Sequence, residues 1–196
     1  KRALIAELNA AKQLGVRGSI VHLGSFKNGN SGVPDSKTWR VLIKNITEVI
    51  SKTPKGALFI SENAGNRKIG QSFDELARIV DDVASPRLKI CLDTCHLFSA
   101  GYNISTEDGL GGVIEEFDDK IGLNRLELIH VNDSRDPFAS MRDRHENIGE
   151  GTLGQSAFKN LINHPKLKHL PFILEVPGFD GEGPDKKNID ILKSLV

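Results

Sequence analysis

Short apolar runs recur along the chain, and longer segments of mixed character separate them. The centres of the runs, such as Ile90-Cys91-Leu92, are almost continuously hydrophobic, which is typical of strands that are covered on both faces. The pattern therefore predicts five buried strands, at Gly18–His22, Ala57–Glu62, Leu88–Asp93, Leu126–Asn132 and Pro171–Glu175.

The segments between these runs place apolar residues every three or four positions, which is the spacing of one helix face. The first segment stops at Gly15, a residue type that often follows the last turn of a helix. Ser72 and Glu75 form a capping-box pair at the start of another segment. The predicted helices are Arg2–Leu14, Ser36–Lys52, Ser72–Ala84, Asp108–Asp119, Gly154–Asn163 and Lys186–Val196. Glycine-rich loops follow two of the strands, at Gly29–Gly32 and Gly178–Gly183.

Strict alternation of strand and helix predicts a parallel sheet with right-handed crossovers. A polar residue closes each strand, in steps of 40, 31, 37 and 45 residues, at His22, Glu62, Asp93, His130 and Glu175. A TIM (β/α)8 barrel averages about 30 residues per unit and carries its chemistry at the carboxyl ends of its strands. Five strands cannot close such a barrel. We therefore expect residues 1–196 to be a single domain formed by the last five βα units, with three units before Lys1; an open sheet is the alternative.

The composition fits one soluble globular domain. The chain has 196 residues, of which 38% are hydrophobic and 27% charged, values that are ordinary for this class. Acidic and basic residues balance, which argues against a protein coated in basic charge but leaves room for a local basic face. No apolar run approaches the ~20 residues that span a bilayer. Cys91 and Cys95 fit neither a disulfide framework nor a zinc ribbon, and we expect a cytoplasmic protein.

Histidine and carboxylate residues gather where the predicted strands end. The segments Leu92–His96, His130–Ser134 and Asp143–His145 are the densest of these groups. Aspartate, glutamate and neutral histidine are ligands that Zn²⁺, Mn²⁺ and Fe²⁺ accept. The candidate metal ligands are His22, Glu62, Asp93, His96, His130, Asp143, His145 and Glu175. Their shared position at one edge of the sheet predicts a multinuclear metal hydrolase.

Each of these residues also has a purely structural interpretation. His22 would be a hydrogen-bonded strand-end histidine, Glu62 a helix cap and Asp93 an N-cap. The segment Asp143–His145 would be a solvated charged loop, and Glu175 an ordinary carboxylate at the rim of the protein. The metal site is the better interpretation, because separate explanations do not account for a histidine or carboxylate at every strand end on the same face.

Four segments resemble the sequence signatures of the endonuclease IV family of apurinic/apyrimidinic endonucleases. The segment Cys91–His96, with Ala100-Gly101-Tyr102 after it, is similar to one signature, and His130–Gly151 is similar to another in content and internal length. Val21–Ser25 and Ser61–Gly65 are similar to two shorter ones.

A few positions depart from the family pattern. Leu23 stands where the family usually has proline, Arg135 replaces a lysine and Ala139 replaces a glycine. The loop after Glu62 also lacks a threonine. No departure removes a ligand, but together they leave the DNA-contacting loops less well defined than the metal site.

The resemblance implies a TIM barrel with three zinc ions. By matched position, Glu62 would bridge the first and second metals, and His22 would bind the first. The second metal would be held by Asp93, His130 and Glu175, and the third by His96, Asp143 and His145. The family needs one more histidine for the first metal, before His22, and this chain has none there. The first site is therefore expected to be incomplete.

The resemblance also implies an enzyme of base excision repair that cuts double-stranded DNA 5′ to abasic sites. Glu62 and Glu175 are the catalytic candidates, because a bridging carboxylate would hold two metals close together and Glu175 would orient the attacking hydroxide. Basic loop residues on the same face would hold DNA phosphates, although solvated loop charge explains them equally well. These residues are Arg67, Lys68, Arg142 and Arg144. We expect a monomer without a membrane partner.

Two other functions remain open. A sugar isomerase or epimerase on the same type of barrel also places glutamate, aspartate and histidine at strand ends, usually for one or two metals. The group Asp143–His145, which would supply a third site, argues against it. An inactive fragment that holds metals without cleaving DNA is the non-enzymatic alternative, and fold alone does not decide among the three.

Overall fold

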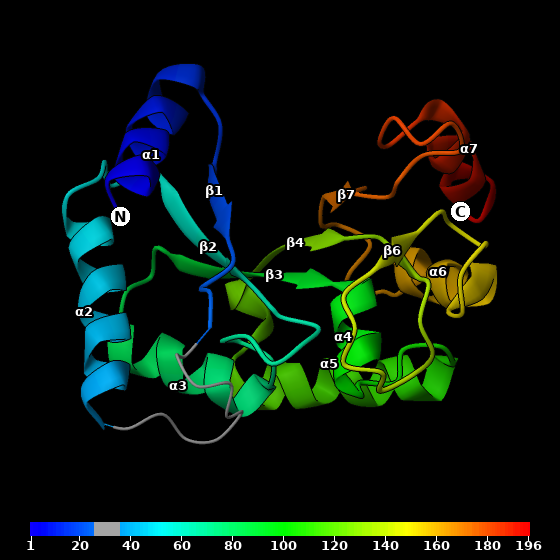
Figure 1. Ribbon diagram of the computed structural model, residues 1–196, viewed down its shortest axis with the longest axis horizontal. Helices are drawn as coiled ribbons and strands as arrows, with labels where there is room; N and C mark the ends of the chain where they lie inside the picture. Colours follow the sequence, from blue (N-terminus) through cyan, green and yellow to red (C-terminus); the bar gives the residue numbers. More distant parts are fainter. Residues whose placement is uncertain (26–35) are drawn as a thin grey trace.

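The structure, a computed structural model, describes residues 1–25 and 36–196. In this part of the chain, five parallel strands form one sheet in the order β1-β2-β3-β4-β7 (Figure 1). They are β1 (Gly18–Val21), β2 (Leu58–Glu62), β3 (Leu88–Asp93), β4 (Leu126–His130) and β7 (Phe172–Ile173). The five predicted strands are confirmed, although most are shorter than predicted. The sheet is open, with β1 and β7 as its edges, and the predicted loop Gly29–Gly32 lies outside the described residues.

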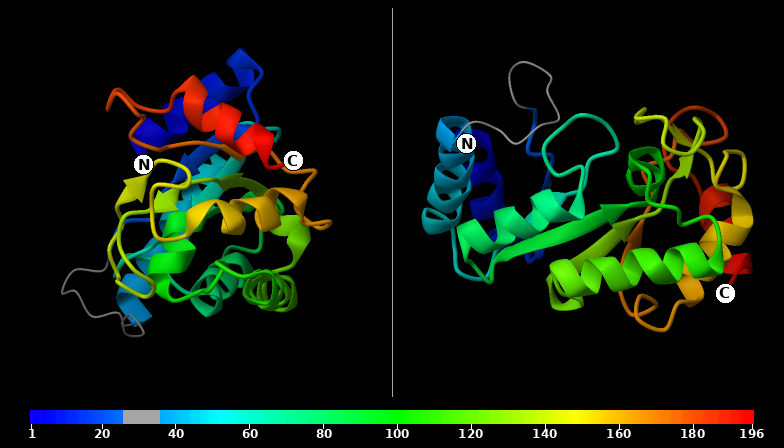
Figure 2. Two further views of the ribbon diagram at one scale, coloured as in Figure 1. Left: turned by 90° about the vertical axis from the view of Figure 1, so that its right-hand side faces the viewer. Right: turned by 90° about the horizontal axis from the view of Figure 1, so that it is seen from below.

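Helices cover one face of this sheet. They are α1 (Arg2–Leu14), α2 (Ser36–Ser51), α3 (Phe73–Val83), α5 (Glu107–Lys120), α6 (Gly154–Asn163) and α7 (Lys186–Ser194). Helix α3 packs between α2 and α5, and α5 also contacts α6, so these four follow the order of the strands (Figure 2). This is the outer layer of a barrel, seen here over five strands. Across the described residues, every helix is too short or too polar to cross a membrane.

The main hydrophobic core lies between the sheet and these helices. Phe73 and Leu76 of α3, Phe117 of α5 and Phe158 of α6 are at most 1% exposed. A smaller cluster, formed by Ile60, Cys91 and Leu128, lies apart from it, on neighbouring strands directly before the ends of β2, β3 and β4. The sheet therefore buries side chains on both faces, as the continuous apolar runs predicted.

Helix caps explain where several elements begin. Ser72 Oγ accepts from Glu75 N, which confirms half of the predicted capping box. The other half differs, because Glu75 Oε2 accepts from Gly70 N, at 2.6 Å, rather than from Ser72. Asp93 caps a short helix, α4 (Thr94–Ala100), that the sequence pattern did not predict. Its first six residues are all buried, so it lacks the polar face on which a helical pattern depends.

Past β4 the chain turns away from the sheet. The predicted strand Leu126–Asn132 ends at His130, because Asn132 N donates to Thr94 Oγ1 and leaves the strand ladder. Strands β5 (Asp133–Ser134) and β6 (His145–Glu146) then form an antiparallel pair that the sequence did not predict. A short 3-10 helix, η1 (Leu123–Arg125), precedes β4.

Candidate metal centre

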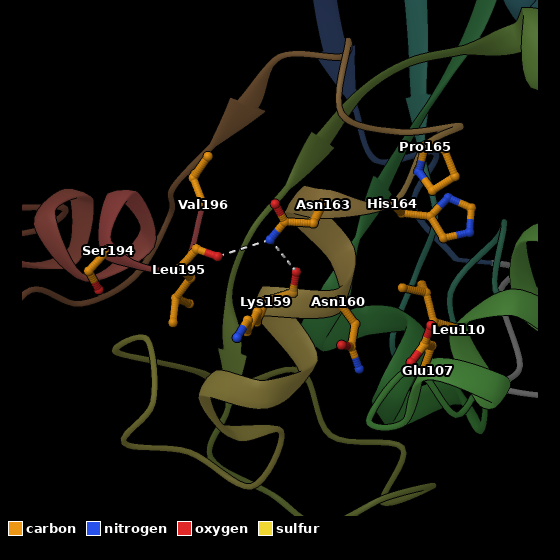
Figure 3. Close-up of a pocket in the computed structure, with 10 residues that line it drawn as sticks. All are labelled: Glu107, Leu110, Lys159, Asn160, Asn163, His164, Pro165, Ser194, Leu195 and Val196. Carbon is orange, nitrogen blue, oxygen red and sulfur yellow. Dashed lines mark hydrogen bonds between the residues drawn. The ribbon is translucent and has the colours of Figure 1, made fainter.

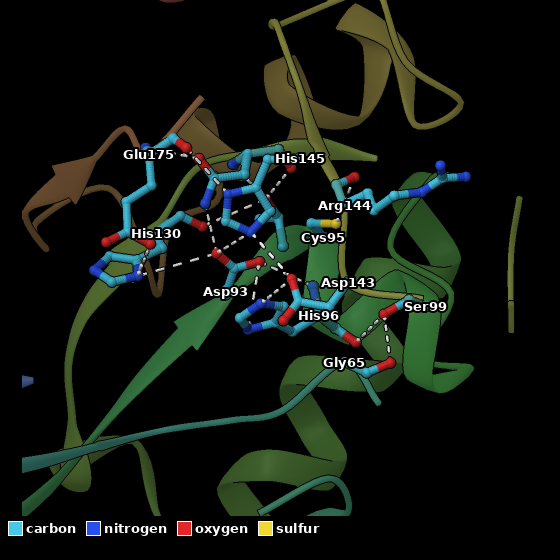
Figure 4. A network of polar contacts seen from close by, with 12 residues as sticks. Gly65, Asp93, Cys95, His96, Ser99, His130, Asp143, Arg144, His145 and Glu175 are labelled. Carbon is cyan, nitrogen blue, oxygen red and sulfur yellow. Dashed lines mark hydrogen bonds and ion pairs between the residues drawn. The ribbon is translucent and has the colours of Figure 1, made fainter. Parts of the chain in front are cut away.

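The carboxyl ends of the strands and the β5–β6 loop bring polar side chains together at one end of the sheet (Figure 4). Three groups each have ligand atoms within 4.8 Å of one another. They are His22, Glu62 and His96; then Asp93, His96 and His145; then Glu62, Asp93, His130 and Glu175. Asp143 joins the second group, since its Oδ1 lies 2.9 Å from His96 Nε2 and 3.6 Å from His145 Nε2. The structure thus places all eight candidate ligands in one continuous cluster.

Glu62 lies at the centre of this cluster and is 3% exposed. Its Oε1 is 3.0 Å from His130 Nδ1 and 3.4 Å from His96 Nδ1, and its Oε2 is 3.3 Å from His22 Nε2. Its two oxygens therefore face histidines from three different segments. This is the arrangement that a carboxylate needs if it is to bridge two cations.

Asp93 combines the structural and the chemical roles that the sequence left open. Its Oδ1 accepts from His96 N at 2.8 Å and so caps α4, while Oδ2 lies 3.7 Å from His145 Nε2. The cap fixes the start of α4 and thereby the position of His96. An N-cap and a metal ligand are consequently compatible at this residue.

Successive side chains in β6 and in the residues just before it point in opposite directions. Asp143 and His145 face the cluster, and Arg144 between them pairs with the carboxylate of Asp136, at 2.7 and 2.5 Å. His145 Nδ1 bonds to the carbonyl oxygen of Glu175, which leaves Nε2 buried and without a hydrogen-bond partner among the described residues. A buried nitrogen without a partner is costly, and a bound cation would satisfy it.

The charges of the cluster also favour a cation. Burial opposes protonation of His96, but Asp93, Asp143 and Glu62 outweigh it and raise the pKa of His96 to about 9. The same balance, with burial opposed by hydrogen bonds to Cys91, Glu175 and Glu62, raises the pKa of His130. Four carboxylates therefore hold positive charge here as protons on histidine, and divalent cations would replace those protons.

The donor set consists of nitrogen and oxygen. Burial raises the pKa of Cys91 to about 11 and that of Cys95 to about 12, so both remain thiols at neutral pH. Neither cysteine belongs to any of the three ligand groups, and both are fully buried, which fits a packing role. Imidazole and carboxylate ligands of this kind suit Zn²⁺, Mn²⁺ and Fe²⁺.

Three of the four basic residues predicted to contact DNA line one groove, and the fourth does not. A groove of about 430 Å³ beside the cluster is lined by Asn66, Arg67, Lys68, Ser140, Met141 and Arg142. Lys68 links it to the cluster, with Nζ 3.5 Å from Asp143 Oδ2. Arg144 is held by Asp136 and does not line this groove.

Two buried amides support the cluster and were missed by sequence reasoning. Asn63 Oδ1 accepts from Asp93 N, and Asn132 Nδ2 donates to Asp93 Oδ2. Both asparagines lie one or two residues after a strand-end ligand, within the signature-like segments Ser61–Gly65 and His130–Gly151, but nothing in the sequence indicated that they contact Asp93. A second hollow, of about 380 Å³, lies between α5, α6 and the last residues of the chain and contains none of the candidate residues (Figure 3).

Known sequences place the chain in a TIM barrel family. A family model described as a xylose isomerase-like TIM barrel matches residues 1–195. A probable endonuclease 4 from Persephonella marina is 37% identical over 196 residues, which are 98% of this chain and 67% of that protein. A probable endonuclease 4 from Akkermansia muciniphila is 46% identical over 143 residues, which are 71% of this chain and 51% of that protein. The chain therefore spans half to two thirds of the length of these relatives.

Solved structures agree on the fold. Endonuclease IV from Thermus thermophilus superposes with a TM-score of 0.80 at 30% identity, over 98% of this chain and 66% of that one. The IOLI protein with a binding zinc atom superposes with a TM-score of 0.69 at 18% identity, over 99% of this chain and 66% of that one. The second likeness shows a TIM-barrel type of fold and nothing finer.

Proposed function

Because the chain belongs to the xylose isomerase-like TIM barrel family, and within it to the endonuclease IV family, we propose that it is part of a zinc-dependent endonuclease. The reaction is hydrolysis of the DNA phosphodiester 5′ to an abasic site, in base excision repair. The observation that carries the proposal is the convergence of four carboxylates and four histidines at one end of the sheet. We also propose that the five strands are the last five of an eight-stranded barrel, a placement supported by the two free edges of the sheet.

The eight clustered residues divide among the cations as follows. Glu62 and His22 would hold one cation. Glu62 would also contribute to a second, together with Asp93, His130 and Glu175. His96, Asp143 and His145 would hold the third. Bound zinc would neutralise the charge of the phosphodiester and make water a stronger nucleophile.

Glu62 and Glu175 have different tasks because their surroundings differ. Glu62 is buried and faces three histidines, so it holds the cluster together. The Glu175 side chain is 47% exposed, and its Oε2 lies 3.2 Å from His130 Nδ1. Glu175 can therefore accept a hydrogen bond from the attacking water at the rim, where the substrate arrives.

The groove beside the cluster supplies the contact with double-stranded DNA. Arg67, Lys68 and Arg142 present positive charge on the same end of the sheet as the cluster. Contacts of this kind with phosphates position a duplex without reading its sequence. Arg144 contributes less, because Asp136 already neutralises it.

A cleavage assay tests the proposal. The protein is incubated with zinc and a labelled duplex that carries one abasic site, and a matched duplex without that site serves as the control. We expect weak incision directly 5′ to the abasic site, because the first ligand set of this chain is incomplete, and loss of that incision after a chelator removes the metal. Turnover of a ketose or aldose without any DNA cleavage would instead support a sugar isomerase or epimerase. Zinc binding without either activity would support the inactive fragment.

A further inference from the structure

Asn132 is a fully buried amide just past β4, and it lies outside the proposed ligand sets. Both ends of its side chain are used. Its Nδ2 donates to Asp93 Oδ2 at 2.5 Å, and its Oδ1 accepts from Glu175 N at 2.8 Å. Asp93 and Glu175 belong to the same four-residue group of candidate ligands. One amide therefore joins two ligands that come from β3 and from the segment after β7.

The first contact controls the orientation of the Asp93 carboxylate. Each carboxylate oxygen can accept two hydrogen bonds. The Asp93 Oδ1 accepts from His96 N, and Oδ2 accepts from Asn132. These two bonds fix the rotation of the carboxylate and leave acceptor capacity on both oxygens for a cation.

The second contact controls the backbone of Glu175. Strand β7 ends at Ile173, two residues before Glu175, and Val131 N donates to Ile173 O at 2.8 Å beside it. The next backbone donor along the chain, Asn132 N, is directed to Thr94 Oγ1 instead. The side-chain oxygen of Asn132 then continues the contact with the β7 segment and holds Glu175, where regular pairing has stopped.

We propose that Asn132 is a positioning residue that sets the placement of Asp93 and Glu175 relative to each other and so determines the affinity of the second cation. The inference rests on the cation cluster proposed above and is independent of the DNA substrate. Residues that orient metal ligands typically change metal affinity by about 10- to 100-fold when they are removed.

Zinc titration of the full chain against a competing chelator tests this inference. Asn132→Ala is expected to weaken zinc binding at least tenfold and to change the visible absorption of the cobalt-loaded protein. Asn132→Ser leaves a hydroxyl and space for water, so it reports the same loss if the alanine variant does not fold. The matched control is Asn188→Ala, since Asn188 is equally buried and bonds to Asn147, Ile148 and Asp185 but to no candidate ligand.

The outcomes separate the inference from the proposed function. Weaker zinc binding in the Asn132 variants, with wild-type affinity in Asn188→Ala, supports the inference. A folded Asn132 variant with unchanged zinc affinity and an unchanged cobalt spectrum overturns the inference. An equal loss of zinc affinity in Asn188→Ala also overturns it, because it would show that any buried asparagine change disturbs the fold. A wild-type protein that binds no zinc overturns the proposed function and this inference together.

Discussion

Glu175 stands at the rim of the cluster, where it would both hold the second cation and orient the attacking water. The hydrogen bond from His130 lowers the pKa of the Glu175 carboxyl, so this group is ionised at neutral pH. Glu175→Gln is expected to leave the affinity for abasic DNA within about twofold and to reduce the single-turnover cleavage rate roughly 100-fold or more, because the amide cannot take a proton from water. Glu182→Gln, a change at an exposed carboxylate in the following loop, is the control and should cleave normally. Near-normal cleavage by Glu175→Gln would remove this role.

His96 makes the stability of the metal-free protein depend on pH. The pKa of His96 is about 9 in the folded protein, compared with 6.5 for the free side chain. Protonated His96 therefore contributes fully to the free energy of unfolding below pH 6.5. This contribution is lost as the pH rises to about 9, because His96 of the unfolded chain releases its proton at a lower pH than His96 of the folded protein. We expect the melting temperature in the presence of a chelator to fall between pH 6.5 and 9. The raised pKa of His130 acts in the same direction.

Substitution of His96 provides the comparison for this pH effect. His96→Gln should melt at a lower temperature near pH 6.5 and show a smaller decrease in melting temperature toward pH 9. His164→Gln, outside the cluster and with a pKa lowered by burial and Lys166, should keep the full decrease. A wild-type melting temperature that rises over this range would contradict the assigned charges.

At the scale of elements, the loop between β5 and β6 holds two arginines, Arg142 and Arg144, whose surroundings differ. Arg142 lines the groove with its side chain 67% exposed and its Nη1 3.6 Å from Asp136 Oδ1, whereas Arg144 donates two hydrogen bonds to the same carboxylate. Arg142→Met is expected to weaken duplex binding and to reduce by about one the slope of log affinity against log salt, since it removes one phosphate contact. Arg144→Met should leave that slope nearly unchanged. Binding isotherms at several salt concentrations measure both, and equal slopes for the two variants would show that the groove is not the DNA contact.

The strands could be predicted from the sequence because they are short, almost continuous apolar runs, and the long helices because their apolar residues recur every three or four positions. Helix α1 and helix α6 begin and end where the apolar spacing placed them. The helix α4 and the hairpin of β5 and β6 could not be predicted in this way. The first is buried on all sides, and each strand of the second is two residues long, which is too short to show alternation.

The candidate ligands could be identified at the same stage because parallel strands end together, so residues far apart in sequence share one edge. Their hydrogen-bonding partners could not. Asn63 and Asn132 act through single contacts to Asp93, and an isolated asparagine after a strand carries no periodic signal. The pairing of Arg144 with Asp136 could not be predicted from the sequence either, because it depends on how the β5–β6 hairpin folds back.

At the scale of the whole molecule, the number of cations follows from the number of ligands. A zinc ion held in a protein usually has three or four protein ligands. The group with Asp93, His130 and Glu175 supplies four ligands when Glu62 is included, and the group with His96 supplies three. The described residues offer the remaining cation His22 and Glu62, together with His96, which already contacts Asp143.

We therefore expect this chain to retain fewer than three zinc ions after exhaustive dialysis, and to cleave abasic DNA poorly on its own. Elemental analysis of the dialysed protein gives the count directly. Asp143→Asn should lower the number of retained zinc ions, because it removes a ligand from a three-residue set that is complete. His22→Ala should leave this number unchanged, because the ligand set that contains His22 does not hold its ion tightly. Three tightly held ions with full cleavage activity would show that His96 is shared between two cations, and that His22, Glu62 and His96 form a complete site within this chain.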